Sequence, residues 1–293
     1  MSQQNLKKLI AFALTEDRVF NDKTSDLCLA KNSRTSFVIK TRESIIFCGK
    51  EVILEVFKQL KKSKKFKNSK LKIEFFGDDC DTFKAGEIIA QGQGCAKLIF
   101  AGERIILNFI QHLSGISTAT NHFVNKLNNS RISILDTRKT FPAYRSLQKY
   151  AVICGGGKNH RFDLSSQILI KDNHLASSKK NIASLINISK KKYKNLQAEI
   201  ECDEYWQVLE ALESKPDIIM LDNMDRKNLE KSIIAIRKKN SKIIIEVSGG
   251  INLENISNYR DLDIDCISIG SVTHSVKAVD IGLDINNAIL NLK

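Results

Sequence analysis

The sequence is poor in the residues that mark fibrous, disordered and membrane-spanning proteins. It contains two prolines and 14 glycines in 293 residues, too few for a collagen-like or low-complexity chain. No run approaches the roughly 18 consecutive apolar residues that span a bilayer. The apolar stretch 9–14 is short, lacks a small-residue cleavage site and continues into charged residues. We therefore interpret it as an amphipathic first helix and expect an ordered globular protein without a membrane partner.

The cysteines and histidines lack the spacings typical of disulfide frameworks and zinc sites. The seven cysteines form no C-x-x-C pair, and several lie in apolar strand-like runs such as 265–269. The five histidines show neither H-x-x-x-H nor H-E-x-x-H spacing. Buried, reduced thiols of this kind are typical of a cytoplasmic protein, which is the location we expect.

Positive charge is in excess, with 46 basic and 33 acidic residues and a net charge of +13. Such a balance raises nucleic acid or another polyanion as a partner. Much of the charge falls in two lysine clusters, 61–70 and 190–194, which contain one aromatic residue each and no arginine. Clusters without arginine or stacking aromatics are weak nucleic-acid signals. We expect solvated faces and no nucleic-acid partner; a binder of that class would show steeply salt-dependent retention.

Six short apolar runs follow residue 130, and they fit strands that are buried on both faces of a parallel sheet. The runs are 132–135, 167–170, 196–200, 217–221, 242–247 and 266–269. Helix-like stretches such as 205–212 and 229–236 alternate with them, and Asp225 is a candidate N-cap of the second. This alternation predicts a βα barrel or a doubly wound sheet.

The residues that follow these runs favour the barrel. Nearly every run ends in charge or glycine, at 136–139, 171–174, 201, 222–223, 248–250 and 270–271. In a βα barrel the carboxyl ends of the strands converge on one mouth, so these residues would surround a common pocket.

The first hundred residues indicate a separate α+β layer. Short strand-like pieces at 36–40, 71–76 and 87–91 accompany a helix-like stretch near 52–60. A long helix is expected over 103–128 and another over 279–292. We predict an N-terminal domain over 1–110, a barrel domain over 111–271 and a C-terminal helical segment over 272–293.

Two basic clusters are candidates for anion binding. Arg138 and Lys139 are adjacent, so both can face one ligand only if the backbone turns there, and such a pair suits carboxylate or phosphate. Residues 155–161 place three glycines before Lys, Asn, His and Arg, but the spacing of a nucleotide-binding P-loop is absent. His160 could act as a general acid or base, or as a neutral donor.

Two carboxylates and two glycine turns complete the candidate pocket. Glu201 and Asp222 suit Mg²⁺, ribose hydroxyls or a cationic transition state, and the alternative is an ion pair with Lys139 or Lys171. The turns at 248–250 and 269–271 fall where many βα barrels hold a phosphate. A Schiff-base role for Lys171, as in an aldolase, is another reading.

Seven segments together resemble the quinolinate phosphoribosyltransferase family, which makes nicotinate mononucleotide for NAD biosynthesis. They are 135–140, 149–152, 154–161, 169–174, 221–223, 246–250 and 270–275, and weaker similarity extends over nearly the whole chain. The resemblance implies an α/β fold: an N-terminal α/β sandwich followed by an incomplete, TIM-like barrel of six βα strands. A related family associated with molybdate transport shares the fold and the T-R-K-T motif, and remains an alternative.

The resemblance also implies roles for individual residues. The implied catalytic residues are Lys139, Lys171, Glu201 and Asp222. The implied substrate-binding residues are Arg104, Arg138, Lys139, Thr140, His160, Arg161, Lys171, Glu201, Asp222, Ser248, Gly249, Gly250, Ser268, Ile269 and Gly270. The implied substrates are quinolinate and 5-phosphoribosyl 1-diphosphate, whose Mg²⁺ ion Glu201 and Asp222 would hold mainly through substrate and water, and no organic cofactor is implied.

Oligomerisation and two local departures follow from the same resemblance. The family forms dimers or larger homo-oligomers, in which Arg104 would enter the neighbouring subunit's site. Ala143 stands where glycine is common after Pro142, and segment 17–26 lacks its usual glycine. Both departures concern loop shape, while the set of cations is intact.

Overall fold

The computed structural model describes residues 3–285, which form two compact units. The first unit takes in the described parts of 1–121, 140–156 and 275–293, and the second contains 122–139 and 157–274. The chain therefore passes between the units more than once. The boundary predicted at residue 110 falls inside helix α4 (Ala96–Leu127), which is continuous across it.

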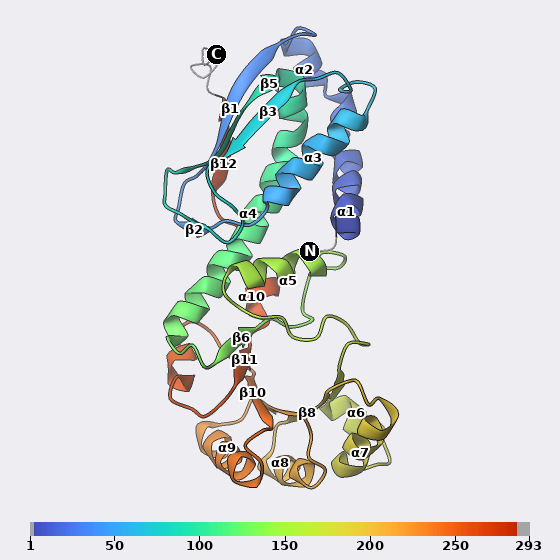
Figure 1. Ribbon diagram of the computed structural model, residues 1–293, viewed down its shortest axis with the longest axis vertical. Helices are drawn as coiled ribbons and strands as arrows, with labels where there is room; N and C mark the ends of the chain where they lie inside the picture. Colours follow the sequence, from blue (N-terminus) through green and yellow to red (C-terminus); the bar gives the residue numbers. More distant parts are fainter. Residues whose placement is uncertain (1–2, 286–293) are drawn as a thin grey trace. The chain divides into compact units, whose positions relative to one another are not determined.

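The first unit is built on a four-stranded antiparallel sheet with the order β12-β1-β5-β3. Its strands are β1 (Arg34–Thr41), β3 (Leu71–Phe75), β5 (Ile88–Cys95) and β12 (Ile281–Ile285), and a small ribbon pairs β2 (Ile45–Ile46) with β4 (Thr82–Phe83). Its helices are α1 (Gln3–Glu16), α2 (Lys23–Cys28), α3 (Lys50–Lys62), α4 and α5 (Arg145–Cys154), with a 3₁₀ turn η1 at Val19–Asn21. Figure 1 shows the sheet and these helices. The predicted strands and the predicted helices within the first 128 residues are confirmed.

The helix predicted over 279–292 is wrong for residues 281–285, which form strand β12. This segment pairs antiparallel with β1, from Phe37↔Ile285 to Thr41↔Ile281. Asp284 also pairs with Lys40 at 2.8 Å. These partners lie about 240 positions away in the sequence, so local helical periodicity carries no information about them. Helix α10 covers only Ser271–His274, and the remainder of the prediction, 286–293, lies outside the described residues.

Residues 140–156 belong to the first unit because α5 packs against α4. The Gln148 side chain lies 3.0 Å from His112 Nε2, and Asn121 donates to the carbonyl of Gly155 at 3.4 Å. A Cβ at Gly155 would lie 2.3 Å from the carbonyl oxygen of Ser117, so only glycine permits this approach. The glycine run after α5 thus has a packing role at its first position.

The second unit is a six-stranded parallel sheet with the order β6-β11-β10-β9-β8-β7. Its strands are β6 (Ser133–Leu135), β7 (Ile168–Ile170), β8 (Ala198–Cys202), β9 (Ile218–Asp222), β10 (Ile244–Ser248) and β11 (Cys266–Ser268). Its helices are α6 (Asp172–Ser177), α7 (Ile182–Lys192), α8 (Tyr205–Leu212), α9 (Arg226–Lys239) and α10, with a 3₁₀ turn η2 at Ile256–Tyr259. All six predicted strands are present, and the α/β fold with a separate N-terminal sheet is confirmed.

Local signals account for the regularity of this unit. The strands are buried on both faces, which is why their sequences are continuously apolar rather than alternating. Asp225 caps α9 by accepting from Asn228 N–H at 2.9 Å, as predicted. Within residues 3–285, no helix has both the length and the apolar character needed to cross a bilayer.

Candidate active site

A pocket of about 470 Å³ lies at the carboxyl ends of the strands of the second unit. Its lining residues are Thr137, Arg138, Lys139, His160, Arg161, Leu169, Lys171, Glu201, Met220, Asp222, Ser248 and Ser268. The sequence predicted a common pocket at these strand ends, and nine of the twelve lining residues are among the predicted site residues. All of them belong to one unit.

Strand alternation explains which side chains reach this pocket. Lining residues are separated by two positions, as in Leu169 and Lys171 on one strand end and Met220 and Asp222 on another. Successive side chains of a strand point to opposite faces, so each pair comes from the same face. Thr137, Leu169 and Met220 were not predicted, although counting back two residues from the predicted charges at 139, 171 and 222 would have found all three.

The end of β6 supplies two cations because the backbone turns there. Lys139 N–H donates to Thr137 Oγ1 at 3.0 Å, and the carbonyl of Lys139 accepts from Thr273 Oγ1 at 2.8 Å. A Cβ at Gly270 would lie 3.0 Å from Lys139 Cδ, so the lysine stem lies against that glycine. The turn brings Arg138 and Lys139 to the same pocket, as the sequence required of them.

Arg161 contributes a third cation, and it is partly buried. Its Nη1 donates to the carbonyl of Gln167 at 3.2 Å. Burial and the nearby charge of Arg138 lower the pKa of Arg161, whereas Glu199 and Glu201 act in the opposite direction. Two neighbouring guanidinium groups over buried carboxylates form a strongly anion-attracting surface.

Lys171 and Glu201 form an ion pair on adjacent strands at the pocket wall. Lys171 Nζ lies 2.5 Å from Glu201 Oε2. This is the ion pair that the sequence left open for Glu201, and both side chains still line the pocket. Asp222 differs, because its Oδ2 accepts from Asn223 Nδ2 at 2.8 Å.

The glycine turn at 248–250 depends on glycine geometry at Gly249. Its φ is +97°, and an added Cβ would lie 2.2 Å from Asn223 Oδ1. Asn223 N–H in turn donates to the carbonyl of Ser248 at 3.0 Å, which connects the ends of β9 and β10. Gly250 also has a positive φ, +61°, but faces open space. The turn therefore holds Ser248 at the pocket.

The structure distributes the remaining predicted residues differently. Ser268 lines the pocket, whereas the Ile269 side chain is buried and its N–H donates to the carbonyl of Leu135 at 2.9 Å. Thr140 belongs to the first unit and its Oγ1 accepts from Arg145 Nε at 3.0 Å. Arg104 is exposed in the first unit, where it lines a separate pocket of about 730 Å³.

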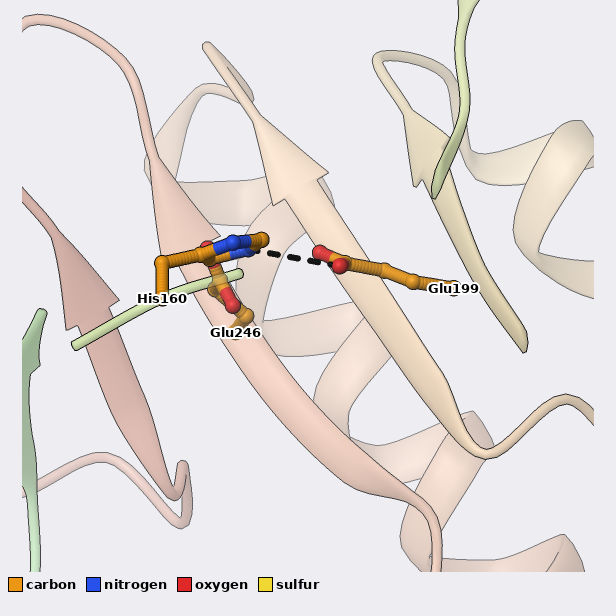
Figure 2. A group of neighbouring side chains, drawn as sticks. All are labelled: His160, Glu199 and Glu246. Atoms are coloured by element: carbon orange, nitrogen blue, oxygen red, sulfur yellow. Dashed lines mark ion pairs between the residues drawn. The ribbon is translucent and has the colours of Figure 1, made fainter. Parts of the chain in front are cut away.

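Beneath the pocket, His160 lies between two buried glutamates. Its Nε2 lies 3.3 Å from Glu199 Oε2 and 3.4 Å from Glu246 Oε1, and Figure 2 shows the three side chains gathered together. Its Nδ1 accepts from Arg161 N–H at 2.7 Å. Both ring nitrogens thus face protein groups, although His160 lines the pocket. The sequence prediction did not include Glu199 or Glu246, although each lies two residues before a predicted site residue, Glu201 or Ser248, on the same strand.

The pKa values of His160 and Glu199 are both raised above their ordinary values. Burial lowers the pKa of His160, but hydrogen bonds to Glu199 and Glu246, together with their charges, outweigh burial and raise it to about 10. Burial raises the pKa of Glu199 to about 7, against the opposing effect of His160. Because Nδ1 accepts from Arg161 N–H, we place the ring proton on Nε2, which faces Glu199 and Glu246.

Two groups of residues offer oxygen or nitrogen ligands for a metal. His160, Glu199 and Glu246 are the one cluster of three such residues found within residues 3–285, with ligand atoms within 4.8 Å of one another. Ser268 Oγ already donates to Glu246, and Gln167 Nε2 already donates to Glu199. Glu201 and Asp222, at the pocket wall, are the carboxylates that can combine with phosphate oxygens and water around Mg²⁺.

Two family models match this chain along most of its length. The N-terminal domain of quinolinate phosphoribosyl transferase matches residues 22–114, and the C-terminal domain of the same family matches residues 116–284. The chain belongs to the quinolinate phosphoribosyl transferase family. A relative from Methanocaldococcus jannaschii, described as a probable nicotinate-nucleotide pyrophosphorylase [carboxylating], is 38% identical over 290 residues, covering 95% of this chain and 96% of that protein.

Solved structures of the family share this fold. The nicotinate-nucleotide pyrophosphorylase from Francisella tularensis is 35% identical, with a TM-score of 0.88 and 98% of each chain covered. That from Ehrlichia chaffeensis is 38% identical, with a TM-score of 0.87 and coverage of 98% of this chain and 99% of that one. These matches favour the quinolinate phosphoribosyl transferase assignment over an aldolase, whose lysine has to be free to attack a carbonyl, while here Lys171 binds Glu201.

Proposed function

We propose that the chain transfers the phosphoribosyl group of 5-phosphoribosyl 1-diphosphate to quinolinate, with decarboxylation. The products are nicotinate mononucleotide, pyrophosphate and CO₂, and the reaction belongs to NAD biosynthesis. The observation that carries the proposal is one pocket that combines Arg138, Lys139, Arg161 and Lys171 with Glu201 and Asp222, in a chain of this family. That combination suits two polyanionic substrates that react through a cationic centre.

The cations provide the first requirement, which is to bring two anions together. Quinolinate carries two carboxylates on a planar ring, and arginine forks match planar carboxylates. We assign Arg138 and Arg161 to these carboxylates, with Lys171 beside them. Lys139 lies against Gly270, and we assign it to the boundary between the carboxylate side and the phosphate side of the pocket. Neutralising both substrates reduces their mutual repulsion, and holding them together removes the entropic cost of their encounter.

The turns and the acids provide the second requirement, which is to hold the ribosyl donor. We assign the turns at 248–250 and 268–270 to its phosphates and Glu201 and Asp222 to the ribose side. The carboxylates also fit Mg²⁺, which in proteins commonly combines one or two carboxylates with substrate phosphates and water. When bound, Mg²⁺ supplies charge neutralisation of the diphosphate. His160 supports the pocket from below, since its ring nitrogens face Arg161 N–H and the buried glutamates.

The chemistry then follows from charge. Breaking the bond between C1 of the ribose and the diphosphate leaves oxocarbenium character, which Glu201 and Asp222 stabilise electrostatically. The ring nitrogen of quinolinate forms the new bond to C1 with its lone pair. When the bond to the C2 carboxylate breaks and CO₂ departs, its electron pair stays at C2, where the adjacent positive charge of the pyridinium nitrogen stabilises it. A proton from Lys139 or a bound water then adds to C2.

Assembly and location complete the proposal. Arg104 is exposed beside a pocket in the first unit, and we infer that it enters the site of a neighbouring copy in a homodimer or larger homo-oligomer. A cytoplasmic location is favoured because all seven cysteines are free thiols.

The deciding experiment is release of labelled CO₂ from quinolinate labelled in its C2 carboxyl group. The protein is incubated with 5-phosphoribosyl 1-diphosphate and Mg²⁺, and nicotinate mononucleotide is measured in parallel. We expect equal amounts of both products, and loss of both in Arg138→Ala. Lys194→Ala, which removes an exposed cation outside the pocket, is the matched control and should retain full activity. Folded wild-type protein that releases no CO₂ would reject the assignment and direct attention to the molybdate-associated family.

A further inference from the structure

Glu199 is connected to Arg161 by two separate routes. In the first, Glu199 faces Nε2 of His160, whose Nδ1 accepts from the backbone N–H of Arg161. In the second, Gln167 Nε2 donates to Glu199 Oε2 at 2.5 Å, while the carbonyl of Gln167 accepts from Arg161 Nη1 at 3.2 Å. One buried carboxylate therefore determines where both the backbone and the guanidinium of Arg161 lie.

Glu246 has the corresponding connection to the other side of the pocket. Its Oε1 accepts from the hydroxyl of Ser268, a pocket residue, and lies 3.4 Å from Nε2 of His160. The Glu199 and Glu246 side chains are 0% and 2% exposed, so neither can contact a substrate. Buried carboxylates are costly unless they are well bonded, which indicates that they are kept here for what they hold in place.

The charge of Glu199 gives a second reason for a buried carboxylate at this position. Arg138 and Arg161 are close enough for their charges to disfavour each other, and the carboxylate of Glu199 offsets this repulsion. Without that carboxylate, the two guanidinium groups would move apart or draw in counterions. The two hydrogen-bonded routes and the charge of Glu199 thus all act on Arg161.

We propose that Glu199 and Glu246 are positioning residues that act on different sides of the pocket. Glu199 positions Arg161 to bind quinolinate, and Glu246 positions Ser268 to bind the phosphoribosyl donor. The inference rests on the proposed function, because it assigns the two sides of the pocket to those substrates. His160 is the shared element that joins the two glutamates. A group placed about 1 Å from its productive position can lose about a hundredfold in rate, so such supports have measurable kinetic effects.

The test compares Glu199→Gln with Glu246→Gln in steady-state kinetics. An amide keeps the size of the carboxylate but turns one acceptor into a donor, which opposes Gln167 Nε2 or His160 Nε2. For Glu199→Gln we expect the KM for quinolinate to rise about tenfold or more, with less than about a twofold change in the KM for 5-phosphoribosyl 1-diphosphate. For Glu246→Gln we expect the opposite split.

A double-mutant cycle separates positioning from general loss of structure. If Glu199 acts through Arg161, then Glu199→Gln should add less than about a twofold effect in the Arg161→Ala background. The matched control is Glu55→Gln in the first unit, a buried carboxylate that accepts from Gln59 Nε2 at 2.9 Å. It should leave both KM values unchanged while testing the cost of the same substitution elsewhere.

Several results would overturn the proposal. A folded Glu199→Gln with a wild-type KM for quinolinate would do so, as would equal shifts of both KM values in both variants, or additive effects in the cycle. If Glu199→Gln does not fold, Gln167→Leu breaks the bond from Gln167 Nε2 to Glu199 while the backbone carbonyl of residue 167 still accepts from Arg161 Nη1. A KM for quinolinate raised severalfold supports the proposal, and no change refutes it. Failure of the proposed function is distinguishable, because wild-type protein would then release no CO₂.

Discussion

Lys171 Nζ and Glu201 Oε2 lie 2.5 Å apart at the ends of the neighbouring strands β7 and β8. The register pairs Ile170 with Ile200, so the next residue on each strand lies beside its partner. A cation assigned to quinolinate and a carboxylate assigned to the ribosyl donor are thereby held together before either substrate binds. In the proposed function, this pair would lie where the two substrates meet.

Lys171→Met should abolish most activity while changing stability little. The lysine side chain is 39% exposed, and ion pairs at such exposure contribute about 0–1 kcal/mol. We expect CO₂ release to fall by about a hundredfold or more, because a preorganised charge is lost from the pocket. Lys40→Met is the matched control, since Lys40 is also 39% exposed and pairs with Asp284 at 2.8 Å in the first unit. Thermal unfolding should shift slightly in both variants, and similar activity in the two would contradict the assignment.

The sequence predicted the strands of the second unit well because its signal there is local. Continuous apolar runs followed by charge identify buried parallel strands, and alternation then determines which residues face one mouth. The sequence could not predict which charges pair. The 2.5 Å contact between Lys171 and Glu201 depends on strand order and register, which no local pattern encodes.

The same limit explains the errors. Strand β12 depends on a partner near residue 40, so its local pattern was misread as helix. Glu199 and Glu246 were absent from the predicted site because their significance comes from His160, which is distant in sequence. Ile269 was carried over with its neighbours, although its side chain is buried and has the opposite strand parity to Ser268.

Gly249→Ala should damage the turn at 248–250 through both strain and contact. The residue has φ +97°, and a Cβ would lie 2.2 Å from Oδ1 and 2.7 Å from the backbone nitrogen of Asn223. We expect a loss of about 2 kcal/mol in the free energy of unfolding and a raised KM for 5-phosphoribosyl 1-diphosphate. Gly86→Ala isolates the strain, because Gly86 has φ +86° but no atom within 4 Å of its Cβ position. Equal destabilisation in denaturant titrations would show that the contact with Asn223 is unimportant.

Ala143→Gly should stabilise the protein. Ala143 has φ +63°, the left-handed conformation that glycine adopts without steric cost. Glycine removes this steric cost but also increases the conformational entropy of the unfolded chain. We therefore expect a net gain of about 0.5–1 kcal/mol in the free energy of unfolding. Asn128→Gly is the comparison, since asparagine tolerates its φ of +48° better and should gain less. A lowered melting temperature for Ala143→Gly would show that the methyl group makes contacts worth more than the strain.

Alkylation of Cys80 should be slow at neutral pH even though this residue is exposed. Burial of the thiol group, a hydrogen bond with Cys154 and the charge of Asp79 raise the pKa of Cys80 to about 12. The thiolate is the reactive form, so its fraction is about one in a thousand at pH 9, and the rate should rise about tenfold per pH unit up to about pH 12. Asp79→Asn should speed the reaction at fixed pH, because it removes a negative charge that disfavours the thiolate. Mass spectrometry of iodoacetamide-treated protein measures the rate, with protein in denaturant as the control. Equal rates in folded and unfolded protein at pH 8 would contradict the shift, since unfolding exposes the Cys80 thiol to water and separates it from Cys154.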